Sequence, residues 1–223
     1  MAEPLPDANL LPALLTAVEA AATVAFALSG LLEAARKRLD AVGVCVVAGL
    51  AAFGGGTLRD VLLDRRPFFW VEHAAWLWGL LALCVAAMGV LRARHFAPTE
   101  RAMQWPDALG LGLFSAGGTQ IALAQGMPAI VAVLMGVVTA TFGGVLRDIV
   151  CNEIPSAFSD HRPYAVCAFA GGWVLVGALA LGVSPGTALL LAAGAASGLR
   201  ALALVTDFRL PQWSSGEDPR GGK

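Results

Sequence analysis

The sequence has little charge for its length: only 14% of its 223 residues are Asp, Glu, Lys or Arg, whereas 57% are hydrophobic. So few polar side chains cannot coat a water-soluble globule of this size, which excludes a soluble fold. The net charge of −1 at pH 7 leaves no basic field that would attract nucleic acid. The composition therefore indicates a membrane protein without a nucleic-acid partner.

Residue types that bind metals or catalyse reactions are also scarce. The three histidines fall in expected loops, and none of the four cysteines forms a Cys-x-x-Cys pair. We interpret the cysteines as small core residues, with a buried disulfide left open, and the histidines as solvated or interfacial. The apolar segments hold no nucleophile with an adjacent base. We therefore expect no enzyme and neither a resident metal nor a cofactor.

Long apolar runs make up most of the chain. A hydrocarbon core of about 30 Å needs about 20 helical residues, and about seven such runs occur, separated by short polar breaks. We expect them at residues 11–32, 41–63, 74–91, 106–124, 128–151, 164–181 and 185–205. The first nine residues lack a basic segment, so we expect no cleaved signal. The sequence thus predicts an all-α membrane protein with seven transmembrane helices.

Two of these runs carry nearly the same motif. FGGGTLRD at residues 53–60 returns as TFGGVLRD at 141–148, with the two arginines 88 residues apart (147 − 59 = 88). Pro67 and Pro155 follow at the same offset, and Glu19 matches Asp107. Because each copy holds an odd number of spans, the second must enter the membrane upside down. We predict two inverted three-helix repeats, residues 1–95 and 96–184, then a seventh helix at 185–206 and a polar tail at 207–223.

The glycines of the motif weaken its two helices. A glycine inside a helix costs on the order of 1 kcal/mol relative to alanine. The first copy has Gly54, Gly55 and Gly56, and the second has Gly143 and Gly144. We expect both helices to kink or unwind there, with the freed carbonyl groups facing an internal pathway as cation ligands. The alternative is that the glycines only allow a close helix crossing.

The motif also places charge at membrane depth. Arg59, Asp60, Arg147 and Asp148 are costly there unless paired or hydrated, which makes them candidates for function. Adjacent helical residues point about 100° apart, so we expect each arginine to pair with another helix rather than with its own aspartate. Each motif lies in the later half of its span, which puts one Arg/Asp set toward each membrane face. The sets are either ion-facing aspartates with gating arginines or static clamps.

Three further polar side chains are assigned to the same path. Glu19 belongs to a polar stripe on one face of the first span, and Ser29 and Thr57 supply hydroxyl groups. Hydroxyl groups inside membranes usually bond the backbone of their own helix, which is the alternative for the last two.

Basic residues are distributed unequally between the two sides of the expected bundle. The loops of one side hold only Arg65 and Arg66. The loops and tail of the other side hold Arg36, Lys37, Arg38, Arg92, Arg94, Arg101, Arg162, Arg209, Arg220 and Lys223. Because positively charged loops stay cytoplasmic, we expect the N-terminus outside and the C-terminus in the cytoplasm.

The paired stretches at residues 54–60 and 143–149, each followed by a proline at the same distance, resemble the prokaryotic trimeric intracellular cation (TRIC) channel family. Members of that family are also known as glycine-transporter-like membrane proteins. The resemblance covers both repeats and the seventh span. It implies a homotrimer in the bacterial plasma membrane, surrounded by membrane lipids, with bound lipid as a candidate ligand.

The resemblance further implies a pore within each protomer, permeable to potassium and other monovalent cations such as sodium and flanked by glycine-broken helices two and five. Beyond these passing ions it implies no metal. Two alternatives stay open: a secondary transporter of a small zwitterion such as glycine, and a membrane protein whose motifs only pack.

Overall fold

The structure, a computed structural model, describes residues 10–94 and 99–211, in which helices are the only regular secondary structure. His95, the first nine residues and the tail from residue 212 lie outside them. The long helices are α1 (Leu10–Arg36), α2 (Ala41–Leu62), α4 (Ala75–Arg94), α5 (Glu100–Ala124), α6 (Ala129–Val150), α8 (Ala165–Ala180) and α9 (Pro185–Thr206). Two short helices, α3 (Phe69–Glu72) and α7 (Ser156–Ser159), follow α2 and α6. The all-α prediction is confirmed.

Length and apolar composition allow four of these helices to cross a membrane by themselves, namely α1, α2, α6 and α9. The apolar part of α4, Ala75–Val90, and the whole of α8 are shorter. Helix α5 is more polar because it carries Gln104, Asp107 and Gln120, which are all buried inside the bundle. The protein is thus an all-helical membrane protein whose more polar helix is covered by its neighbours.

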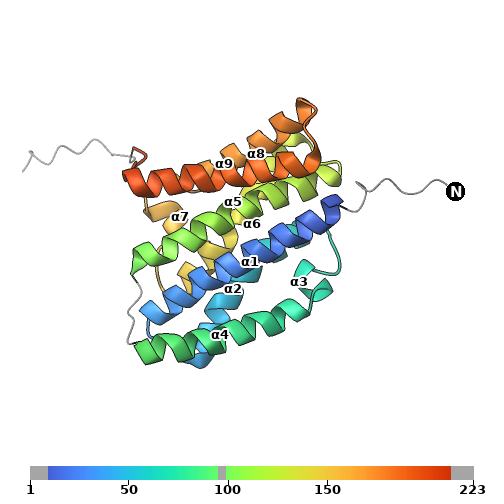
Figure 1. Ribbon diagram of the computed structural model, residues 1–223. Coiled ribbons are helices and arrows are strands. Elements are labelled where there is room, and N and C mark those ends of the chain that lie inside the picture. Colours follow the sequence, from blue (N-terminus) through green and yellow to red (C-terminus); the bar gives the residue numbers. More distant parts are fainter. Residues whose placement is uncertain (1–9, 95–98, 212–223) are drawn as a thin grey trace, which may run out of the picture.

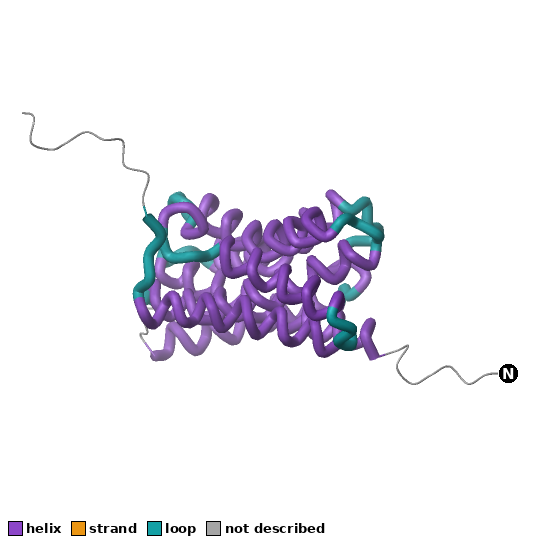
Figure 2. The backbone as a smooth tube through the Cα atoms, turned by 90° about the horizontal axis from the view of Figure 1, so that it is seen from above, coloured by secondary structure: helices purple, strands orange, loops and turns teal. Residues whose placement is uncertain are grey.

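The helices lie side by side as a bundle whose loops gather at its two ends (Figures 1 and 2). Helices α1, α2, α5 and α6 form the centre, in the contacting pairs α1/α2, α5/α6, α1/α5 and α2/α6. Helices α8 and α9 cover one side of this centre, and α4 lies along the other (Figure 1). Side chains at turns and caps fix the helix starts: Asp40 accepts a hydrogen bond from the N–H of Gly43 at 2.7 Å, and Thr99 accepts one from Ala102 at 3.2 Å.

Helices α2 and α6 continue as helices through the motif glycines, so the predicted unwinding at Gly54, Gly55, Gly56, Gly143 and Gly144 is wrong, whereas a kink within an intact helix stays a prediction. Gly54, Gly55 and Gly143 instead lie where the two helices cross, whereas Gly56 faces Phe69 and Gly144 faces Tyr164. Close packing against a neighbouring helix stabilises the helical conformation enough to override the weak intrinsic propensity of glycine. The close-crossing alternative therefore describes Gly54, Gly55 and Gly143.

The two motif copies make matching contacts at the crossing of α2 and α6. A Cβ atom on Gly55 would lie 2.0 Å from the carbonyl oxygen of Thr139, and one on Gly143 would lie 2.2 Å from that of Ala51. Gly55 matches Gly143, and Ala51 matches Thr139, at the offset of 88 residues. The two helices therefore contact each other through equivalent positions, as a pseudo-twofold axis between them requires.

Aromatic packing at the centre follows the same relation. The rings of Phe26 on α1 and Phe114 on α5, also 88 residues apart, stack with centroids 5.6 Å apart and planes inclined by 18°. Both side chains are buried.

Gly30 and Gly118 are another matched pair. A Cβ atom on Gly30 of α1 would lie 2.8 Å from the Cα of Ala48 on α2, and one on Gly118 of α5 would lie 3.1 Å from the Cα of Gly136 on α6. These glycines therefore let α1 approach α2 and α5 approach α6.

Alanine at the crossing tests whether the glycines act by packing. In Gly55→Ala and Gly143→Ala the new methyl group would force α2 and α6 apart, and overpacking of this kind costs about 1–3 kcal/mol. We expect both variants to melt several degrees below the wild type in detergent. The matched control is Gly79→Ala on α4, where nothing lies within 4 Å of the added atom. Equal melting temperatures for all three variants would contradict the packing role.

Candidate functional site

Arg59 is the centre of a buried ion-pair cluster at one end of the bundle. Its guanidinium lies 2.7 Å from the carboxylate of Glu19 on α1, and its Nε donates to Asp60 Oδ1 at 2.8 Å. Arg65, in the loop after α2, brings a second guanidinium to 3.7 Å from Asp60. We call these four residues the Arg59 cluster. It balances two positive charges with two negative ones, and Arg59 and Asp60 are fully buried.

Arg147 is the centre of a second cluster at the opposite end. Its Nε donates to Asp148 Oδ1 at 2.7 Å, and its Nη1 donates to Asp107 Oδ1 on α5 at 2.6 Å. Nη1 also donates to the hydroxyl of Ser29 on α1, which itself donates to Asp107 at 3.2 Å. We call these four residues the Arg147 cluster. One arginine here faces two carboxylates.

These contacts correct one expectation and bear out another. Each arginine pairs with its own neighbouring aspartate, so the prediction that Arg59 would avoid Asp60 and Arg147 would avoid Asp148 is wrong. A long side chain with five N–H donors can fold back along its helix and reach the adjacent carboxylate. Each arginine also pairs with another helix, as expected. Asp107 was recognisable only through its offset of 88 residues from Glu19.

Each motif aspartate also holds the short helix that follows it. Asp60 Oδ2 accepts a hydrogen bond from the backbone N–H of Phe69, the first residue of α3, at 2.8 Å. Asp148 Oδ2 accepts one from the backbone N–H of Ser156, the first residue of α7, at 2.8 Å, and another from the Ser156 hydroxyl at 3.0 Å. Both oxygens of each aspartate are thereby used.

Thr57 joins neither cluster. Its hydroxyl donates to the carbonyl of Phe53 at 2.7 Å and accepts from the indole N–H of Trp70 at 3.0 Å. The side chain lines an apolar cavity of about 360 Å³ beside α2 and α6, together with Leu146. Its hydroxyl therefore forms hydrogen bonds within α2 and with α3, and it belongs to neither ion-pair cluster.

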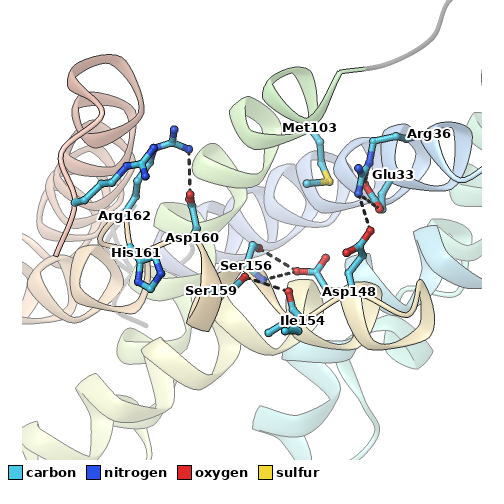
Figure 3. Close-up of a pocket in the computed structure, with 12 residues that line it drawn as sticks. Glu33, Arg36, Met103, Asp148, Ile154, Ser156, Ser159, Asp160, His161 and Arg162 are labelled. Carbon is cyan, nitrogen blue, oxygen red and sulfur yellow. Dashed lines mark hydrogen bonds and ion pairs between the residues drawn. The ribbon is translucent and has the colours of Figure 1, made fainter. Parts of the chain in front are cut away.

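A polar cavity of about 410 Å³ opens at the end of the bundle that carries the Arg147 cluster (Figure 3). Asp148 and Ser156 line it, so it gives access to the cluster from that face. Ion pairs surround it. Glu33 binds Arg36 through two hydrogen bonds of 2.7 and 2.8 Å, and Asp160 lies between Arg162 and the buried Arg200. No sequence motif indicated that these five ion-paired residues would lie around a cavity.

The same end is tied together by a bridge across the loops. Glu153, after α6, pairs with Lys37 and lies 3.4 Å from Arg36, both at the end of α1. Glu153 matches Arg65 at the offset of 88 residues. The two ends of the bundle therefore carry opposite charge at an equivalent position.

Among the described residues, neither the cysteines nor the His, Asp and Glu side chains form a metal site. All four cysteines are free. Within the part of the chain that the structure describes, no three His, Cys, Asp or Glu side chains are grouped so as to hold a metal ion.

Removal of Arg59 tests the burial of charge. Arg59→Leu removes the closest partner of the buried Glu19 and Asp60 and leaves only the partly exposed Arg65, at 4.0 and 3.7 Å. Loss of a buried partner costs up to about 3–5 kcal/mol. Thermal unfolding in detergent should show a large decrease in melting temperature, partly recovered in Arg59→Leu with Glu19→Leu. The control is Arg209→Ala, an exposed ion pair worth little. An Arg59→Leu variant that melts like this control would contradict the account.

Acidification tests the Glu153 bridge. The hydrogen bond from Lys37, with the charge of Arg36, lowers the pKa of Glu153 below its usual 4.5. Its contribution to stability is thus complete above the unfolded-state pKa and is lost as the pH falls through the lower folded-state value. The melting temperature of the wild type should exceed that of Glu153→Gln at pH 7 and converge with it well below pH 4. A difference that persists unchanged in acid would rule out this linkage.

Sequence comparison identifies related membrane proteins. A profile of the family described as "Glycine transporter" matches residues 16–94 and 104–180. A UPF0126 membrane protein of Vibrio cholerae is 37% identical over 181 residues, which cover 79% of this chain and 73% of that protein. The UPF0126 inner membrane protein YadS of Escherichia coli is 35% identical over 68% of this chain and 72% of its own length.

Solved structures agree with these relatives. The TRIC trimeric intracellular cation channel orthologue from Rhodobacter sphaeroides has a TM-score of 0.79 and 34% identity, covering 87% of this chain and 98% of that one. A second TRIC cation channel structure has the same TM-score at 30% identity and covers 90% of this chain. The resemblance to TRIC channels is confirmed, and the chain belongs to the UPF0126 family of membrane proteins described as glycine transporters.

Proposed function

We propose that the protein is a monovalent-cation channel of a bacterial plasma membrane. The observation that carries the proposal is the likeness to the TRIC orthologue from Rhodobacter sphaeroides, which covers 98% of that chain at 34% identity. The inner-membrane name of the Escherichia coli relative supports the location. Potassium is the expected main ion and sodium a second one.

The proposed architecture has seven membrane-crossing helices, which are the seven long helices of the bundle. Helices α1, α2 and α4 form the first repeat, α5, α6 and α8 form the inverted second repeat, and α9 is the seventh. The matched contacts of Gly55 with Thr139 and of Gly143 with Ala51 support this symmetry. The excess of basic residues at the loops near Arg36 and Arg162 supports an outside N-terminus and a cytoplasmic C-terminus.

The two charge clusters favour a cation over an anion as the passing ion. In the Arg59 cluster the charges cancel, and the Arg147 cluster carries one more carboxylate than it has arginines. Each guanidinium is covered by carboxylates, so neither arginine offers a bare positive charge to a cation. We infer that ions entering from that face pass the exposed carboxylate of Glu153 and then reach Asp148, the carboxylate of the Arg147 cluster that lines the polar cavity.

We propose a homotrimer with one path in each protomer. The support comes from the relatives called trimeric channels, and the many exposed apolar side chains supply surface for both lipid and partner protomers. Membrane lipids are therefore partners in any case, and a tightly bound lipid is a candidate ligand.

A secondary transporter of a small zwitterion such as glycine is the second candidate. The description of the matching family is the observation that favours it. Inverted repeats and paired charges would suit carboxylate and ammonium groups equally well. A channel and a transporter differ in their currents, which separates the two proposals.

Recordings from purified protein in planar bilayers test the channel. The wild type should give discrete potassium current steps, and Asp148→Asn should reduce the step size several-fold because it neutralises the carboxylate through which the cavity reaches the Arg147 cluster. The matched control is Asp207→Asn, which removes an exposed carboxylate paired with Arg162 at the same end. Saturable glycine uptake without current steps would replace the channel by the transporter. Unchanged conductance in a folded Asp60→Asn, Asp148→Asn double variant would remove both aspartates from the path.

A further inference from the structure

The two ends of the bundle differ in the side chain of a residue whose backbone role they share, although the two residues, Phe69 and Ser156, are 87 rather than 88 positions apart (156 − 69 = 87). After each motif, the first residue of a short helix binds the motif aspartate through its backbone N–H, at 2.8 Å in both copies. At the Arg147 end this residue is Ser156, whose hydroxyl faces Asp148 and which lines the polar cavity. At the Arg59 end it is Phe69, whose side chain is buried. A polar group thus corresponds to an aromatic ring.

The Phe69 ring covers the Arg59 guanidinium. Its centroid lies 5.3 Å from the guanidinium carbon, and it contacts Phe114 and Trp76 with centroid distances of 6.4 and 5.9 Å. On its remaining side it rests on Gly56, where a Cβ atom would lie 2.4 Å from the ring. Helices α2, α4 and α5 therefore hold this ring directly against the Arg59 cluster.

The equivalent space at the other end is lined by polar atoms. Gly144 matches Gly56 at the offset of 88 residues. A Cβ atom on Gly144 would lie 3.3 Å from the hydroxyl of Tyr164, 3.6 Å from Arg147 Nη2 and 3.7 Å from Asp107 Oδ1. An apolar ring at one end thus replaces the hydrogen-bonding groups found at the other.

We propose that Phe69 is a hydrophobic plug that closes the cation path at the Arg59 end, while the Arg147 end opens through the polar cavity. This inference rests on the proposed channel function. A hydrated cation cannot pass an apolar constriction that excludes water, and such constrictions gate by dewetting. Displacement of the ring from Gly56 would expose the carboxylates of Glu19 and Asp60 to the path.

Bilayer recordings of variants at this position test the plug. Phe69→Ala should raise the potassium current of the reconstituted protein at least several-fold, whereas Phe69→Leu, which keeps an apolar side chain, should raise it much less. The matched control is Phe158→Ala, an exposed phenylalanine of α7, which should leave the current unchanged. A folded Phe69→Ala variant with wild-type current would overturn the proposal.

Thiol labelling gives a readout that does not depend on current. In a background without the four natural cysteines, Ala22→Cys places a thiol in the core one turn from Glu19, and Ser156→Cys places one at the cavity. A charged, membrane-impermeant methanethiosulfonate should label Ser156→Cys in every background. It should label Ala22→Cys only together with Phe69→Ala.

The labelling outcome separates this proposal from the channel function. If Ala22→Cys becomes reactive although no variant conducts, the plug stands and the channel function is rejected. If the wild type conducts but Ala22→Cys remains equally unreactive toward the reagent with Phe69 and with Phe69→Ala, the plug is rejected and the channel function stands.

Discussion

The structure depends on the burial of two arginine side chains in a membrane protein. Arg59 and Arg147 are both fully buried, and an unpaired guanidinium at such a depth would cost several kcal/mol. Each is therefore met by its neighbouring aspartate and by a carboxylate from another helix, Glu19 or Asp107. This pairing ties α1 to α2 and α5 to α6. The second oxygens of Asp60 and Asp148 then fix the chain where α3 and α7 begin.

The close crossing of α2 and α6 complements these ion pairs. Gly55 and Gly143 let the two helices meet backbone to backbone, with the Arg59 and Arg147 clusters on opposite sides of the contact. A close crossing and two charged ends result. The proposed path for ions is then controlled at the ends, where the charges and the Phe69 ring lie.

The repeat made much of this arrangement predictable. The constant offset of 88 residues indicated two related motifs, their placement toward opposite ends and the correspondence of Glu19 with Asp107. Helix continuity was not predictable from the glycines, because close packing between helices outweighs intrinsic propensity. The 100° angle between adjacent helical residues also led to a wrong prediction of the arginine partners, because a long arginine side chain can reach the carboxylate of the next residue.

The differences between the two ends of the bundle could not be predicted from the sequence, for another reason. Glu153, Asp160 and Phe69 lie in or next to connecting segments, where no periodic pattern indicates what a side chain contacts. Arg65 and Glu153 are equivalent in sequence position but opposite in charge, and Phe69 and Ser156 share one backbone role with different side chains. The two motif copies thus supply a symmetric frame around the crossing of α2 and α6, and departures from it give the two ends different properties.

In the proposed channel, cations cross this bundle past its carboxylate-covered arginines. The most direct measurement is the reversal potential of the purified protein in a bilayer separating two potassium chloride concentrations. A channel of this kind should move the reversal potential toward the potassium equilibrium value. A reversal potential at zero or toward the chloride value would contradict the account.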